Sequence, residues 1–416
     1  MRKITFPPAL QYEAYRNYWL GLFGAVSGYQ VLMFGQFWLM HELTGSPLYL
    51  GYIGMANAVP AILLNLVGGV VADKLDKKLL VVLTMALLSM LVLLLGFLTF
   101  FSLVKVWHVM AIGVFTGAIN AFNQPARMSL YPTLVPRKAL TSAVALNSVV
   151  WQATRIVAPA FAGLLIAFLG TAAAFFMAGL GMIVFAWVVQ GLHIPKIENG
   201  PGVKTGQDLL EGLRFIKDNS IFAFLIGMTF FISFFGMSYM TQMPVFAVDI
   251  LHIGADGQGV LLSISGVGSI IITLWIGSIG SYRRKGLVLI GAATLTGLSV
   301  AGFALSCEFI GSYVIASVFM FGIGVFTSAC NISIMSSLQI MVPEHLRGRV
   351  MGFYGMTWDI MPLGGLYVGI VAGFIGAPFA VSVGGFLVSL FAIGPALINR
   401  QVRTLGTHLN RIEDHQ

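Results

Sequence analysis

Long apolar stretches recur along nearly the whole of this 416-residue chain, and they constrain its fold more than any other feature. Each has about the 20 residues that an α-helix needs to cross a bilayer, rather than the alternating pattern of about ten residues typical of a membrane β-strand. Only 9% of the residues are charged, against about a quarter in soluble proteins. The chain is therefore predicted to be an all-α membrane protein. Its twelve expected spans are residues 17–40, 48–72, 79–101, 106–126, 140–168, 171–192, 220–248, 258–280, 287–307, 311–335, 350–374 and 377–399.

The basic residues are distributed unevenly between the two sides of the predicted membrane. When successive connections are assigned to alternate sides, 21 of the 23 Lys and Arg residues fall on one side, Lys105 falls on the other and Arg155 lies inside a span. Positive charge is retained on the cytoplasmic side, so both termini and the central loop are expected there. A formal net charge of +8 would suggest a nucleic-acid partner in a soluble chain. In a membrane protein the distribution of charge matters more than its sum, and we expect no nucleic-acid partner.

The two halves of the chain repeat each other. Gly69 is followed 208 positions later by Gly277, and Gly163 is followed 206 positions later by Gly369. Six spans in each half return the chain to the same side, which makes the halves parallel repeats about an axis normal to the membrane. The expected organisation is an N-terminal six-helix bundle at 1–192, a cytoplasmic linker at 193–219 with an amphipathic helix over 207–218, a C-terminal six-helix bundle at 220–399 and a cytoplasmic tail at 400–416.

The connection after the second span carries a recognisable motif. It reads "GGVVADKLDKK", Gly68 to Lys78, and resembles the signature loop between the second and third helices of major facilitator transporters. The resemblance implies the twelve-helix major facilitator fold, in which two halves rock around a midplane site and this loop latches one half against the other. An ordinary basic loop at the anionic leaflet is the alternative. The residues expected to form the latch are Gly69, Asp73, Lys77 and Lys78, with Arg127 as the cationic partner.

Two further segments narrow the resemblance. "NQPARMSLYPTLVPRKAL", beginning at Asn123, and "VPEHLRGRVMGFY", beginning at Val342, resemble bacterial exporters of the enterobactin-exporter type, also called the transmembrane secretion effector group. This implies a bacterial cytoplasmic (inner) membrane protein. In "RIVAPAFAG", Pro159 and Gly163 match the helix-5 motif of proton-driven exporters, while Ala158 replaces the usual glycine. An ordinary kink with small-residue packing explains the same residues.

Two ionisable residues lie deep inside predicted spans. Asp359 is ten residues beyond Arg349, which places it roughly 15 Å along a helix and near the middle of the bilayer. The repeat places Arg155 about one helical turn from the same level. Charged groups at this depth face a protein interior or a watery cavity, and desolvation favours a neutral carboxyl.

These two residues are candidates for proton coupling. Asp359 is expected to carry protons, with a substrate contact and a hydrogen-bonded structural carboxyl as alternatives. Arg155 could tune Asp359, bind an anionic group of the substrate or hold a structural carbonyl. A direct pair between the two is one way in which they could act together.

Polar and aromatic residues on spans 1, 4, 7 and 10 are the candidates for substrate contacts, because the resemblance implies that these spans line the central cavity. An aromatic wall with few amides suits amphipathic or lipophilic substrates, although each residue could instead be simple packing. The candidates are Tyr29, Gln30, Gln36, Asn120, Asn123, Phe231, Phe235, Tyr239, Gln242, Asn331 and Gln339.

Other chemistry is missing from the sequence. It has no GxxxxGK[ST] phosphate-binding motif, its histidines have no partners at metal-ligand spacing, and no nucleophile–base set stands out. We therefore expect no enzymatic activity, no metal and no cofactor, with a proton gradient as the driving force. The expected partners of this monomer are a small-molecule substrate, protons and the lipid bilayer.

The function predicted from the sequence is secondary active transport. We expect proton-coupled export of a small amphipathic compound, drug- or siderophore-like, by alternating access. Three alternatives stay open: a facilitator or importer in which Asp359 is only structural, a lysolipid translocator of the same fold, and a non-transporting membrane sensor or assembly factor. The repeat and the signature loop argue against the last of these.

Overall fold

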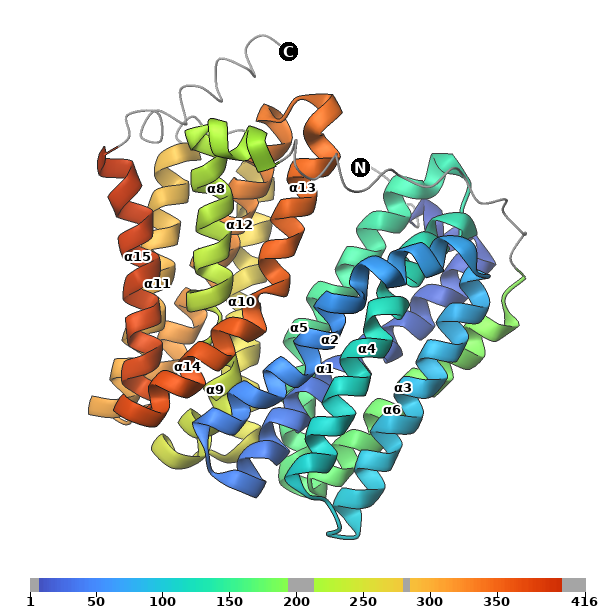
Figure 1. Ribbon diagram of the computed structural model, residues 1–416, viewed down its shortest axis with the longest axis horizontal. Coiled ribbons are helices and arrows are strands. Elements are labelled where there is room, and N and C mark those ends of the chain that lie inside the picture. The colour runs from blue at the N-terminus through green and yellow to red at the C-terminus, as the bar shows by residue number, and fades with distance from the viewer. Residues whose placement is uncertain (1–6, 194–212, 280–284, 399–416) are drawn as a thin grey trace, which may run out of the picture. The chain divides into compact units, whose positions relative to one another are not determined.

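The computed structural model describes residues 7–193, 213–279 and 285–398. Its chain divides into two compact units. The described elements are all helices (Figure 1), with no strand among them, which confirms the predicted all-α class. Unit 1 comprises Met1–Gly45, Ile53–Gly202 and Gly254–Val260, and unit 2 comprises Ser46–Tyr52, Val203–Ile253 and Leu261–Gln416.

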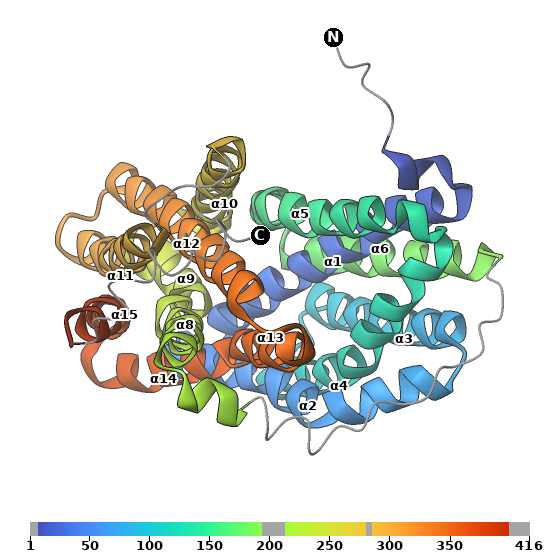
Figure 2. The same cartoon turned by 90° about the horizontal axis from the view of Figure 1, so that it is seen from above.

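Six long helices supply most of unit 1. Helix α1 packs against α5 and α6, and α3 packs against α4 and α6, as the view from above shows (Figure 2). Local sequence sets where these helices begin and end: Gly45 ends α1 in the left-handed conformation, with φ 58° and ψ 14°, and the Asp76 side chain caps α3 by accepting from the Leu79 N–H at 3.0 Å. The helices are α1 Glu13–Thr44, α2 Pro47–Lys74, α3 Lys77–Phe100, α4 Val106–Leu130, α5 Leu140–Leu169 and α6 Thr171–Gly191, with short 3₁₀ turns at η1 Pro8–Gln11, η2 Tyr131–Leu134 and η3 Arg137–Ala139.

Unit 2 differs from unit 1 in having two interrupted spans. The seventh span contains two π-helical segments, and the eleventh is divided into α13 and α14, which run in different directions (Figure 1). Pro244 and Pro362 lie within these spans, and proline removes a backbone donor and favours such breaks. The elements are α8 Ser220–Phe231, η4 Ile232–Gly236, α9 Tyr239–Val245, η5 Phe246–Ile250, α10 Gly254–Ile279, α11 Lys285–Phe309, α12 Tyr313–Met341, α13 Glu344–Asp359, α14 Met361–Ile375 and α15 Ala377–Ile398.

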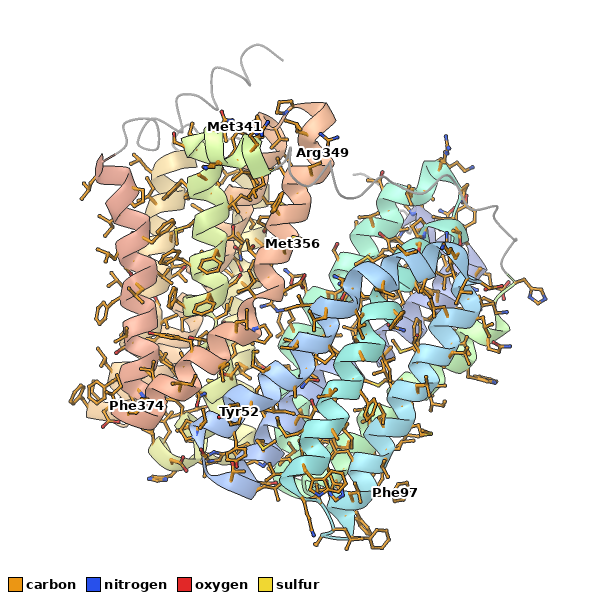
Figure 3. All side chains as sticks on the ribbon, viewed as in Figure 1. Tyr52, Phe97, Met341, Arg349, Met356 and Phe374 are labelled. Carbon is orange, nitrogen blue, oxygen red and sulfur yellow. The ribbon has the colours of Figure 1, made fainter. Side chains whose placement is uncertain are left out.

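The length and hydropathy of the helices fit a membrane protein. Eleven helical segments of the described chain are long and apolar enough to cross a bilayer. The 32-residue α1 is also long enough, although it is not among those eleven, so the predicted count of twelve is consistent with the structure. Large apolar side chains are exposed, including Trp187 at 78% and Phe374 at 85% (Figure 3), as lipid-facing surfaces require. Of the predicted amphipathic helix, residues 213–218 are helical and 207–212 lie outside the described residues.

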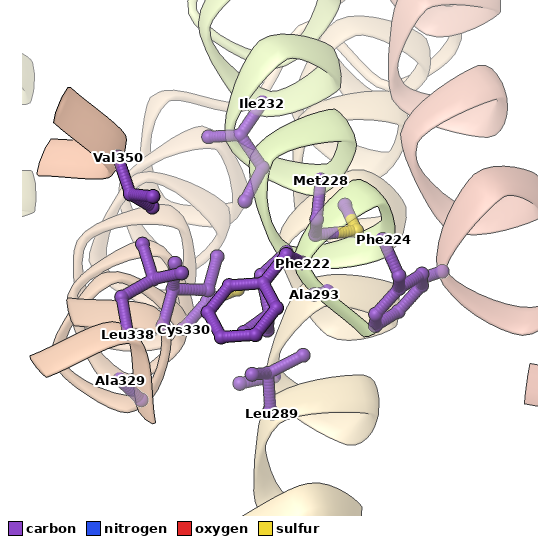
Figure 4. Packing of buried hydrophobic residues seen from close by; sticks show 14 of the residues in the cluster. Phe222, Phe224, Met228, Ile232, Leu289, Ala293, Ala329, Cys330, Leu338 and Val350 are labelled. Carbon is purple, nitrogen blue, oxygen red and sulfur yellow. The ribbon is translucent and has the colours of Figure 1, made fainter. Parts of the chain in front are cut away.

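The core of unit 2 includes a cluster of apolar side chains around α8 (Figure 4). Phe222 and Met228 of α8 lie with Leu289 of α11 and with Cys330 and Leu338 of α12. All five are less than 9% exposed. This packing holds α8, the first part of the seventh span, against α11 and α12. The irregular segment η4 begins directly after α8.

The internal repeat is visible in a glycine contact that occurs once in each unit. Gly117 of α4 lies against the backbone carbonyl of Asn57 of α2, and Gly324 of α12 lies against that of Ser265 of α10. Neither glycine has room for a Cβ atom. Because the paired positions are 207 and 208 residues apart, the sequence repeat corresponds to a repeated close approach of two helices.

Candidate functional site

Unit 1 contains a cluster of buried amide and hydroxyl groups on α1, α2 and α4. The Asn57 Nδ2 donates to Gln36 Oε1 at 3.2 Å and to the Ile53 carbonyl at 3.0 Å. The contact between Gly117 and Asn57 brings α4 close, and with it Thr116. Polar atoms buried without a partner are rare and require an explanation. On these three helices such amide and hydroxyl atoms are Gln36 Nε2, Asn57 Oδ1, Thr116 Oγ1, Asn120 Nδ2 and Asn123 Oδ1.

Unit 2 repeats this feature with fewer groups. Gln242, 206 positions after Gln36, donates through Nε2 to the Pro47 carbonyl at 3.2 Å while its Oε1 has no partner. The Asn331 Oδ1, the Thr327 Oγ1 and the Ser233 Oγ are likewise buried without a partner. Five of the predicted cavity residues, Gln36, Asn120, Asn123, Gln242 and Asn331, thus carry open hydrogen-bonding atoms that a polar ligand or water could use.

The predicted aromatic residues of the seventh span lie in a ring cluster within unit 2. The Phe231 ring stacks on Phe391 of α15 at a centroid distance of 4.0 Å, and the Phe235 ring meets Tyr367 of α14 edge-on at 5.3 Å. Both phenylalanines are partly buried. Packing therefore accounts for much of their surface, with part of each ring left accessible.

The other predicted cavity residues differ in exposure. Tyr29 and Gln30 of α1 are partly buried, Tyr239 of α9 is buried with its ring 6.1 Å from that of Phe303, and Gln339 near the end of α12 is exposed. Asn123 is fully buried and donates to the Thr84 Oγ1 at 2.7 Å, so it joins α4 to α3.

Asp359 is the last residue of α13, at the break in the eleventh span. Arg349 lies near the start of α13 and Phe374 near the end of α14 (Figure 3), which places Asp359 between the two ends of this helix pair. Its side chain is exposed and has no hydrogen bond or ion pair with any described residue. The alternative of a hydrogen-bonded structural carboxyl therefore has no supporting contact in the described chain.

The helix-5 residues pack on the first turns of α10, which belong to unit 1. Gly163 lies against the Ala255 carbonyl, and Gly259 lies against the Pro159 carbonyl. Helix α5 is continuous through Pro159. Arg155 is exposed, and no partner for it is found among the described residues. Small residues on both helices allow this close crossing.

The predicted latch residues that the structure describes each have contacts of their own. Lys78 donates through Nζ to the Leu192 carbonyl at 2.8 Å, at the end of α6. No atom lies within 4 Å of the Cβ position of Gly69, and Lys77 is partly exposed at the start of α3. Arg127 lies over the Trp151 ring at 5.8 Å. The side chain of Asp73 lies outside the described residues.

Comparison with known proteins places the chain in a family. Residues 4–411 match the model of the transmembrane secretion effector family. The chain belongs to this family of major facilitator transporters. It is therefore a multi-pass membrane transporter of small molecules and not an enzyme.

The chain is also similar to named transporters over most of their length. The staphyloferrin A transporter of Staphylococcus aureus is 23% identical over 367 residues, which cover 88% of this chain and 91% of the relative. The enterobactin exporter EntS of Citrobacter koseri is 23% identical over 384 residues, covering 88% and 85%. The solved structure of a bacterial homolog to the human lysosomal transporter Spinster has a TM-score of 0.68 at 14% identity, covering 98% of this chain and 93% of that one.

Several residues of the candidate site in this transmembrane secretion effector protein were not predicted. Asn57, Thr116 and Thr327 carry unpartnered buried atoms, and Trp151 lies against Arg127. Asn57 is a carboxamide within an apolar span, which is a usable signal. Thr116 and Thr327 give no such signal, because an isolated threonine in a membrane helix usually bonds its own backbone.

Proposed function

We propose that this transporter exports a small amphipathic compound, drug- or siderophore-like, in exchange for protons by alternating access. The observation that carries the proposal is the Asp359 carboxyl, which lies at the α13–α14 break without a hydrogen bond or ion pair among the described residues. A carboxyl that no neighbour holds in one protonation state can bind and release a proton during a cycle. One relative is named a staphyloferrin A transporter and another an enterobactin exporter. Both names support a siderophore-like substrate, and the second supports export.

The substrate would be recognised by the open polar atoms in each unit. Gln36 and Asn120 in unit 1, and Gln242 and Asn331 in unit 2, offer donors and acceptors in otherwise apolar surroundings. Sites with a few polar groups on an apolar wall orient amphipathic ligands. Inward movement of a proton on Asp359 and outward movement of the substrate would occur in opposite half-cycles.

The proposed location is the bacterial cytoplasmic (inner) membrane, with both termini cytoplasmic and the proton gradient in place of any cofactor. The excess of Lys and Arg on one side supports this orientation. Fusions of green fluorescent protein and of alkaline phosphatase to the C-terminus test it. Fluorescence without phosphatase activity is the expected result, and the reverse pattern would overturn the orientation.

The transport proposal is tested in proteoliposomes with an imposed pH gradient. Uptake of metal-free enterobactin and of ethidium is measured together with internal pH, for wild type, Asp359→Asn and Asp359→Glu. Gradient-driven uptake with coupled proton movement is expected for the wild type and for Asp359→Glu. Uptake that ignores the gradient in the wild type contradicts proton coupling.

The remaining alternatives give different results in the same assay. A facilitator equilibrates substrate at any pH gradient, and an importer accumulates substrate in the opposite vesicle orientation. A lysolipid translocator moves fluorescent lysophosphatidylcholine between leaflets and ignores the water-soluble probes. We expect none of these three patterns. The open polar atoms suit a ligand with several hydrogen-bonding groups, which argues against a lysolipid in particular.

A further inference from the structure

A cation with unused hydrogen-bonding capacity lies within unit 1. Arg127 is in the last turn of α4, and its Cζ is 5.8 Å from the centroid of the Trp151 ring on α5. Its Nε is buried and has no hydrogen-bond partner. Among the described side chains, no carboxylate pairs with Arg127.

This arrangement leaves Arg127 without a balancing carboxylate among the described side chains, which do not include that of Asp73. A guanidinium stays protonated in proteins, and burying it without a partner is unfavourable. The face of an indole ring attracts a cation, but it accepts no hydrogen bond from the N–H groups along the guanidinium edge. Those N–H groups suit a planar oxyanion, because a carboxylate can accept two parallel hydrogen bonds from one arginine.

We infer that Arg127 and Trp151 form a binding seat for an organic anion that carries a carboxylate beside a flat apolar group. The guanidinium would hold the carboxylate, and the indole would contact the flat group. Arg127 lies in the last turn of α4, at the end assigned to the cytoplasm by the charge distribution, where a substrate leaving the cytoplasm arrives. The inference rests on the proposed function, because the anion is the substrate of that exporter.

The seat is tested with three probes that share one ring and differ in charge. Benzoate is anionic, benzamide is neutral and benzamidine is cationic. Binding of radiolabelled benzoate to the full-length protein in phosphatidylcholine nanodiscs is measured by scintillation proximity, with the other two as competitors. Benzoate is expected to bind roughly 10-fold or more tightly than benzamide, and benzamidine is expected not to compete. Equal competition by benzamide overturns the inference.

Variants of Arg127 assign the effect to this residue. Arg127→Gln is expected to weaken benzoate binding roughly 10- to 100-fold, and Arg127→Lys is expected to weaken it less. Trp151→Ala is expected to weaken it more than Trp151→Phe, which keeps a ring. The matched control is Arg137→Gln, which removes the same charge at an exposed position of unit 1 and should bind as the wild type does. If Arg127→Gln does not fold, benzoate binding by Arg127→Lys and by the two Trp151 variants tests the inference instead.

The same preparations separate this inference from the proposed function. Gradient-driven enterobactin or ethidium transport without any preference for benzoate overturns the seat and leaves the export proposal standing. A preference for benzoate that Arg127→Gln removes, in a protein that transports nothing against a gradient, supports the seat and contradicts the export proposal. Loss of benzoate binding when phosphatidylglycerol replaces phosphatidylcholine would assign Arg127 to a lipid headgroup, which also overturns the inference.

Discussion

Gly364 of α14 lies directly against the backbone carbonyl of Phe234, in the π-helical segment η4, so that a Cβ atom at this glycine would overlap the carbonyl. The next residue, Gly365, would place a Cβ only 2.6 Å from Thr241 Cγ2. The interruption of the eleventh span therefore packs on the irregular part of the seventh. Asp359 lies five residues before this contact, so movement at the break would carry the carboxyl with it.

The Gly364 contact predicts a steric effect. Gly364→Ala should lower the free energy of unfolding by about 1–3 kcal/mol, because backbone must move to admit the methyl group. Thermal unfolding in detergent, followed by intrinsic fluorescence, measures this. The control Gly355→Ala has no atom within 4 Å of the added Cβ and should be neutral or slightly stabilising. Equal behaviour of the two variants would show that the contact is not tight in solution.

The Asp359 carboxyl predicts a coupling defect without a folding defect. Asp359→Asn should reduce gradient-driven transport to the level of empty vesicles while substrate counterflow continues, because the amide cannot exchange a proton. Stability should be unchanged, since no described residue bonds this carboxyl. Glu308→Gln, at an exposed acid near the end of α11, should transport normally. Retained gradient-driven transport in Asp359→Asn would place coupling elsewhere.

Two buried threonines of unit 1 should respond in opposite ways to loss of the hydroxyl. Thr116→Val removes an unpartnered Oγ1, so the free energy of unfolding should stay the same or rise by about 1 kcal/mol. Thr84→Val removes the acceptor for Asn123 Nδ2 at 2.7 Å and should lower it by about the same amount.

Substrate affinity then tells whether the Thr116 hydroxyl meets a ligand. Thr116→Val should weaken enterobactin binding roughly 5- to 10-fold in a direct binding assay, the amount expected for one lost hydrogen bond. An unchanged affinity would mean that only water uses this group.

Lys78 is expected to stabilise the fold by its hydrogen bond to the end of α6. Its Nζ donates to the Leu192 carbonyl at 2.8 Å, so Lys78→Met should lower the free energy of unfolding by about 1–2 kcal/mol. Lys77→Met changes the neighbouring charge without breaking that bond and is the control. If Lys78 acts as a latch, Lys78→Met would instead alter transport and leave the free energy of unfolding unchanged. Transport and unfolding are therefore measured on the same preparation.

The sequence by itself predicted the class and the number of spans. Membrane helices are recognisable from local hydropathy, because each segment must satisfy its own backbone within the bilayer. The offset of 206 to 208 residues likewise revealed the repeat, since Gly117 and Gly324 make the same contact in their units. Buried amides such as Gln36 and Gln242 were identifiable because a carboxamide is uncommon in an apolar span.

Only the tertiary structure decided which of these groups have partners. Lys78 bonds a carbonyl 114 positions away, Arg127 lies over Trp151, and Gly364 meets Phe234. The π-helical form of the seventh span was also invisible in its composition. Hydropathy and charge are properties of one segment, so the sequence of that segment reveals them. Hydrogen bonding and close approach depend on which helices pack together and at what height in the membrane. The spacing of residues along the chain does not contain that information.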